Sequence, residues 1–93
     1  MLKWFSSKEE ETFGKELAQF LADRLPPKAK LSDAKQEQLF PKFVSKIDQF
    51  KSSHKLNMYK KAKLANSFKW HLLDLDFANS FVDEMTKELV LLL

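Results

Sequence analysis

The chain has 93 residues, of which 44% are hydrophobic, and it contains no cysteine. A chain of this length lies near the lower end of what can bury a self-sufficient core, so we expect a single domain spanning residues 1–93. The absence of cysteine excludes a disulfide framework and a thiolate metal site.

The basic residues gather in the middle of the chain. Residues 28–69 contain eleven lysines and three acidic residues, a local charge of +8, whereas the whole chain has a formal net charge of +3. Residues 70–93 contain five acidic residues and one basic residue. The middle segment could attract an anionic partner, or the two ends could fold against it and neutralise it.

The composition favours helices over strands. Only six residues are β-branched and only one is glycine, which argues against a sheet with tight hairpins. We predict an all-α fold, a compact bundle of four helices, in which short connections make successive helices antiparallel neighbours. The predicted core consists of Phe13, Leu17, Phe20, Leu21, Phe40, Phe43, Ile47, Phe68, Leu72, Phe81, Val82, Met85 and Leu89.

The first helix is predicted to begin at Ser6 or Ser7, because Ser7 and Glu10 have the spacing of a capping box. It should end before Pro26, since a residue that precedes proline avoids the helical conformation. Gly14 lies inside this helix, where glycine costs about 1 kcal/mol relative to alanine. Either another helix approaches closely at Gly14, or the glycine is merely tolerated.

The second helix is predicted to begin with Ser32 as its cap and to continue through an apolar stripe that ends at Phe50. Pro41 falls inside this stripe and removes a backbone hydrogen bond. We therefore predict a helix kinked near Pro41; the alternative is a short helix joined to a longer one.

The third helix is predicted to begin at Ser53 or Asn57 and to end near Leu73. Its predicted core face consists of Met58, Ala62, Ala65, Phe68 and Leu72. The fourth helix, capped by Asp74 or Asp76, has the most regular apolar stripe of the chain, formed by Ala78, Phe81, Val82, Met85, Leu89 and Leu92.

Opposite its core face, the third helix carries a second group of apolar and cationic side chains, and these are the candidate partner-binding residues: Leu56, Tyr59, Lys63 and Trp70. Tyrosine and tryptophan are enriched where proteins bind one another, and aromatic rings beside a cation also suit base stacking with phosphate contact. A third interpretation is a central helix that packs on both sides and keeps its polar tips in water.

A candidate anion-binding set comprises Lys35, Lys42 and Lys46 of the second helix, which recur at helical spacing, together with Lys60 of the third. The alternative is a lysine-rich face that only keeps the helix solvated. Because Arg24 is the one arginine, base-specific reading of nucleic acid is disfavoured.

No catalytic, cofactor or metal site is predicted. Ser67, His71 and Asp74 have a spacing that places them on one side of a helix, but such side chains project roughly parallel, whereas a catalytic triad needs converging groups. Two histidines without cysteine match no recognised metal-binding spacing.

Both ends of the chain are apolar, at Met1–Phe5 and at Leu89–Leu93, and they could pack together or form a homodimer contact. No apolar run is long enough for a signal peptide or a membrane span, so we expect a cytoplasmic protein. The function that these patterns favour is a non-enzymatic protein-interaction or regulatory module that binds a protein partner or itself. The alternative is a basic nucleic-acid-binding protein that contacts the phosphate backbone without sequence specificity.

Overall fold

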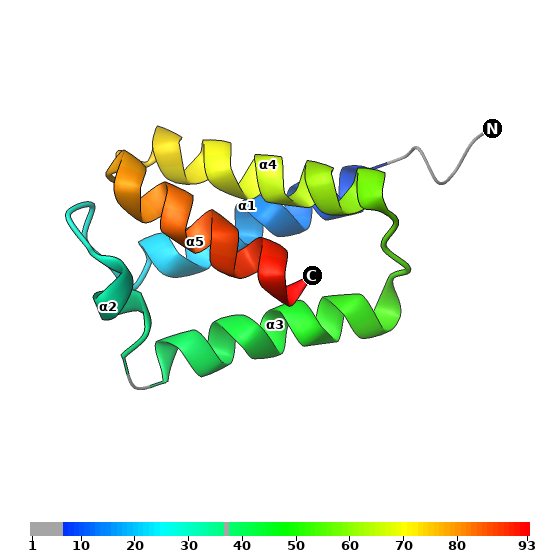
Figure 1. Cartoon of the computed structure of the whole chain (residues 1–93), viewed down its shortest axis with the longest axis horizontal. Helices are drawn as coiled ribbons and strands as arrows, with labels where there is room; N and C mark the ends of the chain where they lie inside the picture. The colour runs from blue at the N-terminus through cyan, green and yellow to red at the C-terminus, as the bar shows by residue number, and fades with distance from the viewer. Residues whose placement is uncertain (1–6, 37) are drawn as a thin grey trace.

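The computed structural model describes residues 7–36 and 38–93 (Figure 1). These residues contain five α-helices and no strand. The helices are α1 (Lys8–Ala22), α2 (Leu31–Ala34), α3 (Leu39–Ser53), α4 (Met58–Asp74) and α5 (Asn79–Leu92). The all-α prediction is confirmed, and the four long helices run in alternating directions along the chain. The apolar segment Met1–Phe5 lies outside the described residues.

The predicted count of four helices is wrong because the predicted second helix is divided into α2 and α3. Since α3 begins at Leu39, Pro41 occupies its first turn, where a backbone N–H has no acceptor within the helix. The predicted kink at Pro41 is therefore absent, and the alternative of a short helix followed by a longer one is confirmed. Ser32 is not the cap of α2; instead, the carboxylate of Asp33 accepts a hydrogen bond from the backbone N–H of Lys30 at 2.8 Å.

The closest contact between helices joins α1 to α4 at Gly14. A Cβ atom at Gly14 would lie 2.5 Å from the carbonyl oxygen of Leu64 and 3.0 Å from the backbone nitrogen of Phe68. On the same side, the hydroxyl of Ser67 donates a 2.6 Å hydrogen bond to the carbonyl oxygen of Glu11. The glycine thus permits a close approach of two helix backbones, as the first interpretation of Gly14 predicts.

One continuous core contains most of the predicted residues, while Phe13 and Phe40 are only partly buried against it. The predicted core face of α4 is wrong in its first two turns, because Met58 and Ala62 are exposed. The buried side of α4 consists instead of Leu64, Ala65, Phe68 and Leu72.

Aromatic rings connect α3 to the rest of the bundle. Phe50 stacks on Phe13 of α1 with ring centroids 4.2 Å apart, and Phe43 lies 5.8 Å from Phe68 of α4. Because these large side chains lie between them, the backbones of α3 and α1 are farther apart than the backbones of α4 and α1, which meet at Gly14. The helix is therefore attached by side-chain packing without a close backbone contact.

Among the described residues, two polar contacts join lysines of the basic middle to α5 at the acidic end of the chain. The ammonium group of Lys35 lies 3.4 Å from the carboxylate of Glu88, and Lys51 donates a 2.9 Å hydrogen bond to the carbonyl oxygen of Leu92 near the end of α5. Both contacts place a cation against α5, which supports the interpretation that the ends partly neutralise the middle.

The end of α4 is a Schellman motif. Asp76 adopts a left-handed conformation with φ 69°, its N–H bonds to the carbonyl of Leu73, and the N–H of Phe77 bonds to the carbonyl of Leu72. The side chains of Phe77 and Leu72 are both buried. The prediction that Asp74 or Asp76 caps the next helix is thus wrong, since α5 has Ala78 at its N-cap.

Replacing Gly14 by alanine should lower the free energy of unfolding. Alanine gains about 1 kcal/mol in helix propensity, but the new methyl group meets the backbone of α4, and overpacking of this kind costs about 3 kcal/mol. Urea unfolding of Gly14→Ala should therefore show a net loss of about 2 kcal/mol. Thr12→Ala, at an exposed position of the same helix, is the control and should change little. A more stable Gly14→Ala protein would contradict the close approach.

Replacing Asp76 by glycine should raise the free energy of unfolding by about 0.5–1 kcal/mol, because glycine adopts the left-handed conformation without steric cost. Asp74→Gly is a matched control, since it removes the same carboxylate from a helical residue two positions earlier. It should lower the free energy by about 1 kcal/mol. The same sign of change in both variants would argue against the left-handed turn.

Candidate interaction surfaces

Exposed large hydrophobic side chains gather on two adjacent helices. In the described part of the chain they are Met58 (86% exposed), Tyr59 (39%), Trp70 (59%), Val90 (55%) and Leu91 (82%). The first three belong to α4 and the last two to α5, the helix that returns beside it (Figure 1). No large hydrophobic side chain of α1, α2 or α3 is exposed to this degree.

The outer face of α4, defined here as Met58, Tyr59, Ala62, Lys63, Asn66 and Trp70, carries three of the four predicted partner-binding residues. Tyr59, Lys63 and Trp70 lie on this face as predicted, with the Lys63 ammonium 5.5 Å from the centre of the Tyr59 ring. Leu56 does not lie there, because it precedes the first residue of α4 and lines a separate hollow with His54 and Leu93.

Two depressions border the outer face of α4. On the α1 side, a groove of about 360 Å³ is lined by Lys15, Lys63, Trp70 and His71, among others. On the α5 side, a depression of about 500 Å³ is lined by Lys69, Asp83, Thr86, Lys87, Val90 and Leu91. The Lys69 ammonium lies 5.8 Å from the centre of the Trp70 ring, so this lysine connects the α5 depression to the outer face.

Ser67 and His71, two members of the triad-like spacing with Asp74, each form a polar contact with α1. The hydroxyl of Ser67 donates to a backbone carbonyl of α1, and the ring nitrogen Nε2 of His71 lies 3.3 Å from the amide oxygen of Gln19. Among the described residues, no three histidine or acidic side chains gather in a way that could hold a metal ion, and no helix is long and apolar enough to cross a membrane.

The predicted anion-binding set is divided among the turn after α2, helix α3 and helix α4. Lys35 follows α2 and contacts Glu88, Lys60 lies in α4, and only Lys42 and Lys46 share α3. The three lysines predicted to recur along one helix therefore do not share a single helical face. The break between α2 and α3 separates Lys35 from the other two lysines that were assigned to the same helix.

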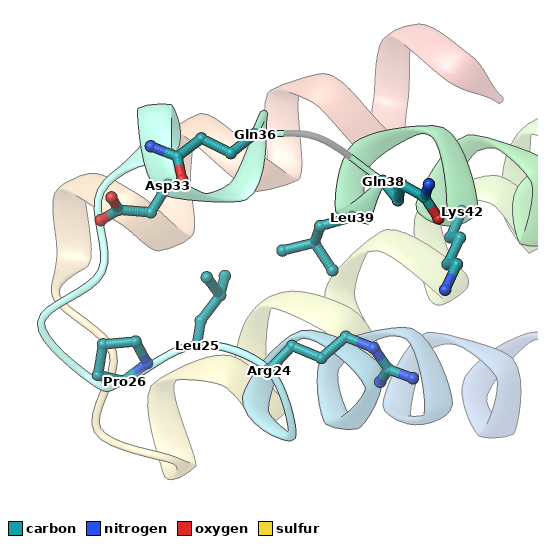
Figure 2. Close-up of a pocket in the computed structure, with 8 residues that line it drawn as sticks. All are labelled: Arg24, Leu25, Pro26, Asp33, Gln36, Gln38, Leu39 and Lys42. Carbon is teal, nitrogen blue, oxygen red and sulfur yellow. The ribbon is translucent and has the colours of Figure 1, made fainter.

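Arg24, for which the sequence offers no binding role, lies with the two lysines of α3. Its guanidinium carbon lies 4.0 Å from the centre of the Phe20 ring, and the Lys46 ammonium lies 5.1 Å from the same centre. Arg24 and Lys42 line one hollow between the end of α1 and the start of α3 (Figure 2). No sequence signal joins these residues, because their proximity depends on how α1 packs beside α3.

His54 connects the end of α3 to α1. Its Nε2 atom lies 2.9 Å from the carboxylate of Glu9, its Nδ1 atom lies 3.1 Å from the carbonyl oxygen of Phe50, and its ring stacks on that of Phe50. The hydrogen bond to Glu9 raises the pKa of His54 above its ordinary value of 6.5, against a smaller opposing effect of desolvation. The carbonyl of Phe50 and the charges of Glu9 and Glu10 raise this pKa further.

Comparison of the chain with protein-family models, with curated proteins and with solved structures gives no significant match. The assignment of a function therefore depends on the surfaces described above.

The contact between His54 and Glu9 makes stability depend on pH. Because the pKa of His54 is higher in the folded protein than in the unfolded chain, the contact stabilises the fold fully below 6.5 and loses this effect as the pH rises through the raised pKa. The free energy of unfolding should fall as the pH rises above 6.5 and through the raised pKa of His54, as measured by urea titration. His54→Gln should remove this fall, and the control His71→Gln should keep it. An unchanged fall in His54→Gln would show that another group is responsible.

Proposed function

We propose that this protein is a non-enzymatic interaction module that binds a partner protein through the outer face of α4 and the adjoining end of α5. The observation that carries the proposal is the confinement of the exposed large hydrophobic side chains in the described chain to these two helices. Large apolar side chains that are exposed on neighbouring helices often mark a site of interaction, and tryptophan and tyrosine are the residues that most often dominate binding energy.

The charges around this face favour an acidic amphipathic segment as the partner. Helix α4 contains four lysines and one acidic residue, Asp74, and Lys15 of α1 and Lys87 of α5 line the two bordering depressions. Glu11, Asp74 and Asp83 also line these depressions, so the four lining lysines, Lys15, Lys63, Lys69 and Lys87, exceed the acidic groups by one. A peptide with acidic residues beside an apolar stripe would satisfy both the rings and the cations.

A second copy of the chain fits the same face less well. If two α4 helices met across a two-fold axis, Lys63 and Lys69 of one would lie near those of the other, and juxtaposed like charges disfavour association. We therefore propose a different protein as the partner, and self-association is a result that would contradict this choice.

Binding to the phosphate backbone of nucleic acid is the competing function. Aromatic rings with lysines would suit single strands, but two lysines of the basic middle, Lys35 and Lys51, contact α5. Because these two lysines already contact α5, the excess of lysines in residues 28–69 is weaker support for binding nucleic acid. A titration with single-stranded DNA at low and high salt separates the two functions, since backbone binding weakens steeply as salt rises.

Selection of binding peptides from a random library tests the proposal without knowledge of the natural partner. The selected peptides should be acidic and amphipathic. Trp70→Ser should weaken their binding at least tenfold, which corresponds to about 1.4 kcal/mol, because it removes the largest exposed ring of the face. Since Trp70 is mostly exposed, the variant should keep its thermal stability.

Charge variants supply the matched comparison. Lys63→Glu should weaken the binding of these peptides, whereas Lys28→Glu, an equal charge change in the exposed connection between α1 and α2, should not. Three results would contradict the proposal: selected peptides that are basic, peptides that bind Trp70→Ser as tightly as the natural chain, or single-stranded DNA that binds more tightly than any peptide and is released by Trp70→Ser.

A further inference from the structure

The hollow between the end of α1 and the start of α3 combines cationic and apolar walls. It has a volume of about 490 Å³ and is lined by Arg24, Leu25, Pro26, Asp33, Gln36, Gln38, Leu39 and Lys42. We call it the Arg24–Lys42 hollow. It lies apart from the outer face of α4, because none of its lining residues belongs to α4 or α5.

The two cations lie at one end of this hollow. In Figure 2, the guanidinium group of Arg24, from the turn after α1, and the ammonium group of Lys42, from α3, extend toward the same side, with the amide of Gln38 beside Lys42. Lys46, whose ammonium lies against the same Phe20 ring as Arg24, adds a third cation nearby. Two cations thus line the hollow, and a third lies against the same ring as one of them.

The acidic groups among the described residues compensate this charge only in part. Asp33 lines the hollow, but in Figure 2 it lies at the opposite end, near Pro26, and its carboxylate accepts the backbone N–H of Lys30. Asp23, on the preceding turn, accepts a hydrogen bond from Gln19. The first turn of α3 contains no acidic residue that would offset the positive end of its dipole.

An apolar floor separates the two ends. The side chains of Leu25 and Leu39 point toward each other across the hollow in Figure 2, and both are half-buried against the core. A ligand with an anionic group and a small apolar body would place the first between the cations and the second on this floor. Binding sites of this volume commonly combine an apolar lining with a few polar groups that fix orientation.

We propose that the Arg24–Lys42 hollow binds a small organic phosphate, with the phosphate between Arg24 and Lys42 and the organic group on Leu25 and Leu39. A guanidinium group binds phosphate oxygens in pairs through its planar array of N–H donors, and an ammonium group adds a charge-assisted bond. The Arg24 guanidinium uses one nitrogen to donate to the carbonyl oxygen of Phe20 at 3.0 Å, which fixes its position at the edge of the hollow.

Titrations followed by two-dimensional NMR test this proposal with phenyl phosphate as the probe. Phenyl phosphate should shift the amide signals of Leu25, Gln38 and Leu39 in a saturable manner. Inorganic phosphate should bind the same residues more weakly, because it lacks the organic group, and phenol should not bind, because it lacks the charge. No saturable shift with phenyl phosphate, or shifts spread over the lysines of the whole surface, would overturn the proposal.

Charge-matched variants identify the residues responsible. Lys42→Gln should weaken binding about tenfold, the expected effect of losing one charge-assisted contact, whereas Lys28→Gln should leave it unchanged. Arg24→Lys keeps the charge but removes the paired donors, so it should also weaken binding. Equal losses in Lys42→Gln and Lys28→Gln would show that only net charge matters and would overturn the site.

Binding of phenyl phosphate in the Arg24–Lys42 hollow does not depend on the function proposed for the outer face of α4. Trp70→Ser should leave phenyl phosphate binding unchanged, and Lys42→Gln should leave peptide binding unchanged, because the two sites share no residue. Loss of phenyl phosphate binding in Trp70→Ser would show that the probe binds at α4 and would overturn the assignment to the hollow.

Discussion

The close approach of α1 and α4 at Gly14 is the contact on which the arrangement of the other surfaces depends. Without a side chain between the two backbones, Ser67 reaches the carbonyl of Glu11, and this hydrogen bond determines the rotation of α4 about its own axis. Leu64 and Phe68 then face the core, so Met58 and Trp70 must face outward. The exposed face of α4 is therefore a consequence of how its opposite side packs, and a change at Gly14 would disturb it through the fold.

The charged side chains of the lysine-rich middle mainly help to position the helices relative to one another. Lys35 and Lys51 contact α5, and His54 contacts α1, so the basic middle is connected to both ends. Exposed ion pairs stabilise a protein by about 1 kcal/mol or less, so these contacts guide the placement of α3 more than they strengthen the core. Lys63 and Lys69 lie instead beside aromatic rings, which leaves their charges at the surface where a partner could meet them.

Several elements were predictable because they depend on local patterns. Helical spacing of Leu and Phe correctly predicts the all-α class and most of the core. Met58 and Ala62 were misassigned because the buried side of α4 continues toward Lys61, whose aliphatic stem is half-buried while a sequence pattern counts it as polar. The kink at Pro41 was wrongly predicted because the effect of a proline depends on its place in the helix. Proline disrupts the interior of a helix but is tolerated in the first turn. Where α3 begins depends on tertiary packing, which the sequence pattern does not show. Arg24 was missed because only the tertiary fold brings it near Lys42.

The two proposed sites differ in how they would affect the fold. Helix α3 is held by side chains such as Phe43 and Phe50 without a close backbone contact. An anion between Arg24 and Lys42 would add a bridge from α1 to α3, and any ligand that binds only the folded chain stabilises it by mass action. A peptide on the outer face of α4 would instead cover a helix that Gly14 already holds tightly to α1. Occupation of the hollow should therefore protect the amides of α3 from hydrogen exchange more than those of α4, because α3 is the helix whose attachment the bridge would reinforce.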